Sequence, residues 1–161
     1  MSFINITSEW TLKIAEGKVY LKKEFSKDGI IYKVDNKRVF IKLNSNEIKI
    51  ANILAKTYGK TVEIIPCVTF PQGIQTPDYL IDGEYFDLKT PTGGSKNLFY
   101  NILSKKKKQS QNFIIDITYC QIGTQEAFSQ AQKLYLSRHT RFIDKLVIIK
   151  NGKIVCVYAK N

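Results

Sequence analysis

The chain is poor in the residue types on which several common sites depend. In 161 residues it has one histidine, His139, and three cysteines, Cys67, Cys120 and Cys156. An odd number of widely spaced cysteines is typical of reduced thiols, and zinc sites need closely spaced Cys and His pairs that this sequence lacks. A Ser-His or Cys-His nucleophile would have to use His139, which stands in a basic, loop-like stretch. These chemistries are therefore disfavoured.

Long hydrophobic runs are also missing. No apolar stretch approaches the roughly 20 residues that a transmembrane helix needs. The first ten residues have no basic stretch followed by an apolar segment, which is the pattern of a secretory signal peptide. We therefore expect no signal peptide and no transmembrane segment in this chain, no membrane partner, and a cytoplasmic site of action.

Acidic residues are scarce relative to basic ones. The sequence has 25 Lys and Arg against 14 Asp and Glu, a formal charge of +11. With 43% hydrophobic residues, a packed globular fold is expected. The excess of positive charge favours a polyanionic partner, but it does not choose among nucleic acid, an anionic membrane and an acidic protein, and a simply solvated surface gives the same number.

Periodicity and turn signals predict an α/β fold with a mixed sheet. Residues 1–45 read as a β-rich N-terminal extension and residues 46–161 as the main domain. In the extension, short strands are expected at 11–14, 19–21, 30–34 and 39–43. In the main domain we expect helices at 46–58, 95–108 and 125–136, strands at 62–65 and 113–118, and hairpins at 76–89 and 146–158.

The hairpin at 76–89 carries the most distinctive chemistry. Asp82-Gly83 predicts a two-residue type I′ turn, which sets a register with Asp78 opposite Asp87 and Lys89 on the same face. Residues directly opposite each other have Cβ atoms about 4.5–5.5 Å apart, so the two carboxylates repel unless something compensates. A divalent cation such as Mg²⁺ would do so. The Lys89 ammonium would also do so, which leaves a purely structural surface cluster as the alternative.

These residues resemble the motif of the PD-(D/E)XK nuclease superfamily. Pro77-Asp78 is followed, after eight residues, by Asp87-Leu88-Lys89. The resemblance implies a helix–three strand–helix–strand core, catalytic roles for Asp78, Asp87 and Lys89, and a metal held by the two aspartates. Glu47 would be a third metal ligand, although Asn44-x-x-Glu47 also reads as a capping box at a helix start.

A broader resemblance covers most of the chain from Glu47 onward. Its segments are Glu47-x-x-x-Ala51, Pro71-Gln72-Gly73-Ile74, Thr76-Pro77-Asp78-Tyr79-Leu80, Asp87-Leu88-Lys89-Thr90-Pro91 and Asn112-Phe113-Ile114-Ile115-Asp116-Ile117. They are similar to the tRNA-cleaving C-terminal domains of contact-dependent inhibition (CdiA-type) toxins and to related phage and mobile-element modules. The resemblance implies an RNA-cleaving toxin countered by an acidic immunity protein.

Some toxins of that group instead have a metal-independent barnase/EndoU/colicin/RelE-like fold. If this chain followed them, Lys89, Asp116 and Thr118 would supply the acid–base and phosphate contacts. Asp78 and Asp87 would then be structural, and no metal cofactor would be needed. The sequence leaves both mechanisms open.

Other polar groups are candidates for binding substrate. Lys105, Lys106 and Lys108 belong to a four-lysine run that, with Arg138 and Arg141, would track phosphates, or would simply be solvated. Ser95, after Gly93-Gly94, would offer a phosphate contact at a helix start. The sequence hypothesis is thus a metal-dependent endonuclease acting on RNA, tRNA in particular. DNA remains an alternative substrate, and a non-enzymatic basic nucleic-acid-binding module is the third reading.

Overall fold

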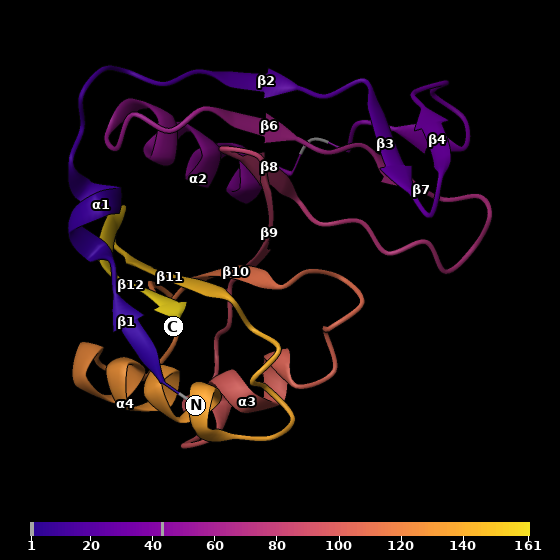
Figure 1. The fold of residues 1–161 in the computed structure, drawn as a ribbon. Coiled ribbons are helices and arrows are strands. Elements are labelled where there is room, and N and C mark those ends of the chain that lie inside the picture. The colour runs from indigo at the N-terminus through magenta and orange to yellow at the C-terminus, as the bar shows by residue number, and fades with distance from the viewer. Residues whose placement is uncertain (1, 43) are drawn as a thin grey trace. The chain divides into compact units, whose positions relative to one another are not determined.

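The computed structural model describes residues 2–42 and 44–161 and divides into two compact units (Figure 1). Unit 1 comprises Met1–Leu12 and Asp87–Asn161, and unit 2 comprises Lys13–Phe86. These units divide the chain at positions other than the predicted 45/46 boundary. The division falls inside strand β9 (Glu84–Lys89), so Asp87 to Lys89 belong to unit 1 and the rest of the hairpin at 76–89 belongs to unit 2.

Unit 1 is built on a buried mixed sheet. Its strands follow the order β1-β12-β11-β10, and after β10 comes β9, of which the last three residues belong to this unit. β10 pairs in parallel with β11, whereas β12 is antiparallel to β11 and to β1. All five residues of β10 are buried, as predicted for a strand covered on both faces. The bounds are β1 Phe3–Asn5, β9 Glu84–Lys89, β10 Asn112–Asp116, β11 Lys145–Lys150 and β12 Lys153–Lys160.

The helices described in unit 1 are α1 (Thr7–Thr11), α3 (Leu98–Leu103) and α4 (Thr124–Leu136). α4 lies where the sequence predicts it and packs into the main core, a cluster that includes Phe99, Phe113, Ala131, Leu134, Tyr135 and Ile148. The predicted strand at 11–14 is wrong, because α1 ends there with Trp10 buried. The predicted helix at 95–108 is too long, because α3 covers only its middle.

Unit 2 holds one helix against a second set of strands. α2 (Ser45–Lys56) begins at the expected cap, where the Asn44 side chain accepts hydrogen bonds from the backbone N–H groups of Asn46 and Glu47. The strands follow the order β9-β8-β6-β2, with β2 and β6 parallel and the other pairs antiparallel. Their bounds are β2 Val19–Leu21, β6 Val62–Ile64 and β8 Tyr79–Ile81.

Two small antiparallel pairs complete unit 2. β3 (Glu24–Lys27) and β4 (Ile30–Lys33) form a hairpin, and β5 (Val39–Phe40) pairs with β7 (Cys67–Val68). Phe25, Val39, Ile65 and Val68 are their shared buried cluster. β3 and β7 are absent from the sequence prediction. Of the predicted strand at 39–43, only the first two residues are β structure, and Leu43 lies outside the described residues.

No helix among the described residues is long and apolar enough to cross a membrane, in line with the hydropathy of the sequence.

Candidate active site

The β8–β9 hairpin has the predicted turn and register. Asp82 and Gly83 have positive φ angles of 50° and 82°, and the ladder pairs Ile81 with Glu84, Leu80 with Tyr85 and Tyr79 with Phe86. Tyr79, Ile81 and Phe86 are fully buried on one face. Asp87 follows Phe86 in β9, so alternation turns its side chain to the opposite face from this apolar trio, whereas Asp78 lies just before β8.

Asp87 lies at the centre of a closed cluster in unit 1. Its carboxylate is 1% exposed, and Oδ2 lies 2.8 Å from Lys89 Nζ. Oδ1 accepts a hydrogen bond of 3.0 Å from Gln109 Nε2. Lys89 Nζ in turn donates to Gln109 Oε1 at 3.1 Å. Because the amide oxygen faces an obligate donor and the amide nitrogen faces an obligate acceptor, only one orientation of the Gln109 amide satisfies both contacts.

Gln109 is the site residue that sequence reasoning missed. After Leu103 the lysine run does not continue the helix but forms turns, in which the Gln109 N–H donates to the carbonyl of Lys106 at 2.9 Å. The chain then enters β10 through Ser110, whose hydroxyl donates to the carbonyl of Asn112 at 2.8 Å. A glutamine after a lysine run carries no motif. Its role follows only from the neighbouring position of β10 and β9 in the sheet.

The burial of the cluster is asymmetric. Asp87 is enclosed, whereas the Lys89 side chain is 21% exposed. A buried carboxylate loses hydration that the ammonium and the amide must replace, and removing one partner of such a pair typically costs about 3–5 kcal/mol. The ammonium is therefore the charged group of this cluster that solvent reaches, while the carboxylate and the amide fix its position.

The other two predicted metal ligands belong to unit 2. Asp78 is half-buried, and its backbone N–H donates to the carbonyl of Phe86 at 3.1 Å. The carbonyl of Glu47 accepts from the Tyr79 hydroxyl at 2.6 Å, and its N–H is held by the Asn44 cap. Across residues 2–42 and 44–161, no group of three or more His, Cys, Asp or Glu is placed to hold a metal. The roles of Asp78 and Glu47 as ligands stay predictions.

Asp116 and Thr118, the alternative site, are tied into the end of β10. Asp116 is 4% exposed, and its Oδ1 accepts hydrogen bonds from both the backbone N–H and the hydroxyl of Thr118. The Thr118 hydroxyl oxygen accepts from the N–H of Asn151 at 2.9 Å, which links this corner to the β11–β12 turn. These bonds give both residues a structural task, and a catalytic role for them stays a prediction.

The predicted substrate-binding residues are dispersed over unit 1. Ser95 accepts from the N–H of Asn97 at 3.1 Å and shapes the turn before α3. Lys105 and Lys108 are exposed and Lys106 is half-buried. Arg138 and Arg141 are both exposed, and they follow Ser137 at the edge of a small hollow.

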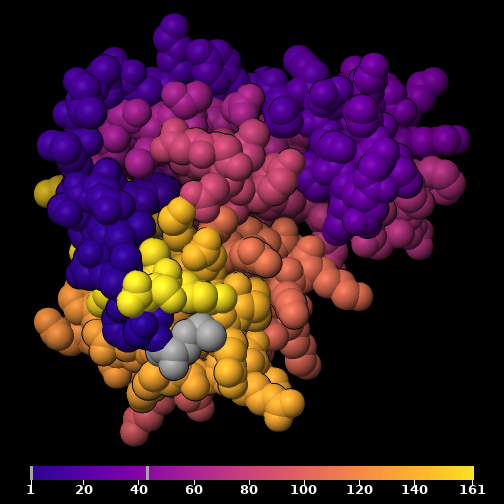
Figure 2. Space-filling model, viewed as in Figure 1, coloured from indigo at the N-terminus to yellow at the C-terminus, as the bar shows by residue number. Residues whose placement is uncertain are grey.

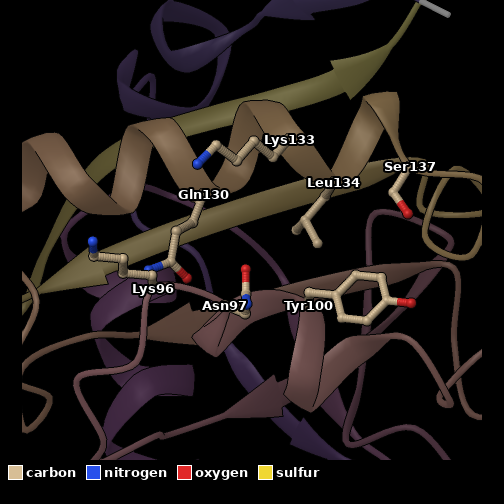
Figure 3. Close-up of a pocket in the computed structure, with 7 residues that line it drawn as sticks. All are labelled: Lys96, Asn97, Tyr100, Gln130, Lys133, Leu134 and Ser137. Carbon is tan, nitrogen blue, oxygen red and sulfur yellow. The ribbon is translucent and has the colours of Figure 1, made fainter.

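That hollow, of about 100 Å³, lies between α3 and α4 (Figure 3). Leu134 of α4 points toward Tyr100 of α3 in Figure 3, and the Tyr100 ring makes an edge contact with His139 at 6.5 Å between centroids. Gln130 closes the hollow with its amide, which donates to the carbonyl of Ser95 and accepts from the N–H of Phe99. The lining residues are Lys96, Asn97, Tyr100, Gln130, Lys133, Leu134 and Ser137.

The chain is similar to known proteins in sequence and in fold. Residues 75–154 match the family described as the contact-dependent growth inhibition CdiA C-terminal domain. The fold is similar to a chain of the "CdiA-CT/CdiI toxin and immunity complex from Burkholderia pseudomallei", with a TM-score of 0.54 and 24% identity over 69% of this chain and 80% of that one. No curated protein matches the chain. The segment that matches this family model, residues 75–154, contains Asp87, Lys89 and Gln109.

Proposed function

We propose that the chain is a toxin module that acts as an endonuclease on RNA, tRNA in particular, with Asp87 and Lys89 as its catalytic pair. The observation that carries the proposal is the enclosed Asp87 carboxylate held by a partly exposed Lys89 ammonium at 2.8 Å. Both residues lie in the segment that matches the CdiA C-terminal domain family, and the fold is similar to that of a chain in a toxin and immunity complex.

Phosphodiester cleavage builds negative charge on the non-bridging oxygens of the phosphate. A fixed ammonium aimed at that charge stabilises the transition state more than the ground state, and such groups are typically worth about 10²–10³ in rate. Lys89 is suited to this role, because Asp87 and Gln109 hold its Nζ from two sides. The contact with Asp87 also limits the rotation of the ammonium.

The cluster of Asp87, Lys89 and Gln109 is poorly suited to hold the predicted metal ion. Asp87 is its single carboxylate, and its two oxygens contact Lys89 and Gln109. As arranged, these residues form an ion pair and do not fit a centre with several acidic ligands. The chemistry assigned here is therefore that of the side chains alone, and the requirement for Mg²⁺ stays a prediction. This arrangement also favours the second candidate mechanism, a metal-independent ribonuclease.

The expected partner is an acidic immunity protein. The chain has a formal charge of +11, and complementary charge steers association and raises its rate. The structurally similar chain comes from a toxin and immunity complex. An acidic partner that covers Lys89 would block access to the exposed part of the ammonium.

The test is cleavage of total tRNA and of plasmid DNA by the purified chain, with and without EDTA. We expect fragments from tRNA, and a loss of at least about 100-fold in rate for Lys89→Gln. Lys107→Gln is the matched control, because it removes an exposed lysine of the nearby run and keeps the same change of charge. Thermal unfolding of both variants shows that they are folded.

The same assay separates the alternatives. Loss of cleavage in EDTA supports the metal-dependent mechanism that the sequence predicts. Cleavage that survives EDTA and leaves a 2′,3′-cyclic phosphate supports attack by the 2′-hydroxyl of the RNA. Cleavage of plasmid alone assigns DNA as substrate. Full activity of a folded Lys89→Gln variant would sink the assignment of the catalytic pair.

A further inference from the structure

We propose that Arg38 and Phe70, in unit 2, form a stacking platform for an unpaired base of single-stranded RNA. The inference rests on the proposed function only in taking RNA as the ligand. The platform consists of residues outside the segment that matches the toxin family and outside the Asp87–Lys89 cluster. It would bind the substrate and would take no part in bond cleavage.

The two side chains are already stacked and lie at the surface. The Arg38 guanidinium carbon is 4.8 Å from the centroid of the Phe70 ring, within the range of a cation–π contact. Phe70 is 58% exposed, which is a large fraction for a phenylalanine in a chain with well-filled cores. Both groups are planar, and planar rings and guanidinium groups are the surfaces on which splayed-out bases stack.

The backbone under the platform is held by several bonds. The carbonyl of Arg38 accepts from the N–H of Thr69 at 2.7 Å and from its hydroxyl at 2.9 Å. Val39 and Val68 pair across β5 and β7, and both are buried in the cluster with Phe25. The loss of conformational entropy on binding is therefore small, because the two backbone segments that carry Arg38 and Phe70 are already ordered relative to each other.

Asp35 orders the loop from the other side. Its Oδ1 accepts from the N–H groups of Lys37, Arg38 and Val39, at 2.9, 2.8 and 2.9 Å. These bonds stabilise the carboxylate and lower its pKa to about 2. The carboxylate is thus committed to the loop backbone, which leaves the Arg38 guanidinium to the ring of Phe70.

The surroundings of the platform are basic, as a polyanion requires. Residues 13–42 contain nine Lys or Arg against four Asp or Glu. Lys27, at the end of β3, reaches the loop that follows Phe70, where its Nζ donates to the carbonyl of Gln75 at 3.4 Å. The region around β3, β4 and β7 lies at one end of unit 2 in Figure 1, and its purple atoms lie at the surface in Figure 2.

An unpaired base fits these features better than a duplex. A duplex presents phosphates and groove edges, for which scattered lysines suffice, whereas an exposed ring with a guanidinium offers a flat face of limited area. Stacking also accepts any base, so the platform predicts weak sequence preference. Loss of one stacked base typically weakens binding about 5- to 100-fold.

The experiment is fluorescence anisotropy of a labelled 12-residue RNA with the full chain, in EDTA and with Lys89→Gln as background to prevent cleavage. Phe70→Leu keeps the apolar bulk and removes the aromatic face. Arg38→Lys keeps the charge and removes the planar group. The matched controls are Tyr20→Leu, which removes another exposed aromatic ring, and Lys37→Gln, which removes the adjacent exposed charge.

We expect Phe70→Leu to weaken single-stranded RNA binding about tenfold, and Arg38→Lys to weaken it by a smaller factor. Both should leave binding of the same sequence as a duplex unchanged, and Tyr20→Leu should have no effect. Lys37→Gln should reduce the salt slope and affect both forms of RNA alike. A parallel loss for single-stranded DNA also supports stacking on bases.

The platform is refuted if the Phe70→Leu variant binds single-stranded RNA as tightly as the wild type. It is also refuted if the variant loses the same affinity for single-stranded RNA and for the duplex. These measurements are independent of cleavage. If the wild type cleaves RNA and the Phe70→Leu variant binds single-stranded RNA normally, the platform alone is refuted. If the wild type does not cleave RNA and the Phe70→Leu variant loses single-strand binding, the nuclease proposal alone is refuted.

Discussion

At the scale of single residues, Gln109 determines how well Lys89 is placed. Without the amide, Lys89 Nζ would keep only the Asp87 contact, and the other Asp87 oxygen would lose its hydrogen bond. A hydrogen bond to a charged group typically contributes about 1.5–3 kcal/mol. In the proposed reaction a displacement of about 1 Å at a catalytic group is enough to slow catalysis considerably.

We predict that Gln109→Met lowers kcat for RNA cleavage about tenfold or more and leaves KM nearly unchanged. Methionine has the length of glutamine but cannot hold the ammonium. Gln111→Met is the matched control. Gln111 is exposed, and its backbone carbonyl, which the substitution keeps, accepts a hydrogen bond from the N–H of Asp144. Steady-state kinetics on one RNA substrate provide both constants.

A double variant distinguishes positioning from general support of the fold. If Gln109 acts through Lys89, Gln109→Met should add no further loss in a Lys89→Gln background, since residues that act as a unit are not additive. Equal losses in both backgrounds, together with a lower unfolding temperature, would show that the amide only stabilises the fold.

At the scale of elements, local rules predict the turns and the buried strands well. Asp82-Gly83 and Asn151-Gly152 both adopt the positive φ angles that a type I′ turn needs, so both predicted hairpins are present. α4 and β10 stand where their apolar patterns place them. In these segments the determining interactions are between residues close in sequence.

Elements held by distant partners escape prediction. β1 pairs with β12, more than 150 residues along the chain, and α1 is fastened by the Thr7 hydroxyl, which accepts from the N–H of Val157 at 2.9 Å. α3 ends early, although lysine is a good helix former, because the contacts of Gln109 and Ser110 replace the last helical turn. Asp87 and Lys89 are neighbours on one strand and could be predicted together. Gln109 could not.

One close approach between segments of unit 2 gives a prediction at this scale. Gly17, just before β2, donates its N–H to the carbonyl of Ala55, and a Cβ at Gly17 would lie 1.8 Å from the carbonyl oxygen of Lys60. Gly17→Ala should therefore destabilise the chain by about 3 kcal/mol or more, because backbone must move. Urea denaturation, followed by circular dichroism, measures the change.

Gly29, in the β3–β4 turn, is the comparison. It has a φ of +78° but no atom within 4 Å of an added Cβ. Gly29→Ala should cost only the left-handed strain, about 1–2 kcal/mol. If the two alanine variants were equally stable, the close approach of residues 17 and 60 would be refuted.

At the scale of the whole molecule, buried titratable groups of unit 1 make the stability of the fold depend on pH in the alkaline range. Cys156 is 3% exposed in β12, and burial raises the pKa of its thiol to about 12. Burial likewise raises the pKa of Tyr135 and of Tyr158. All three cysteines are free thiols, as their spacing predicts.

The direction of the pH effect follows from the raised pKa of Cys156. The unfolded chain loses this proton near the ordinary thiol pKa of about 9, whereas the folded chain keeps it until about pH 12. The contribution to the free energy of unfolding is therefore complete below pH 9 and declines as the pH rises toward 12.

We predict that the stability advantage of the wild type over Cys156→Ala is smaller at pH 10.5 than at pH 7.5, measured by urea denaturation. Ile154→Val, a substitution on the same strand without a titrating group, should cost the same at both pH values. A Cys156→Ala difference that stays constant across this range would show that the thiol ionises equally readily in the folded and unfolded chains.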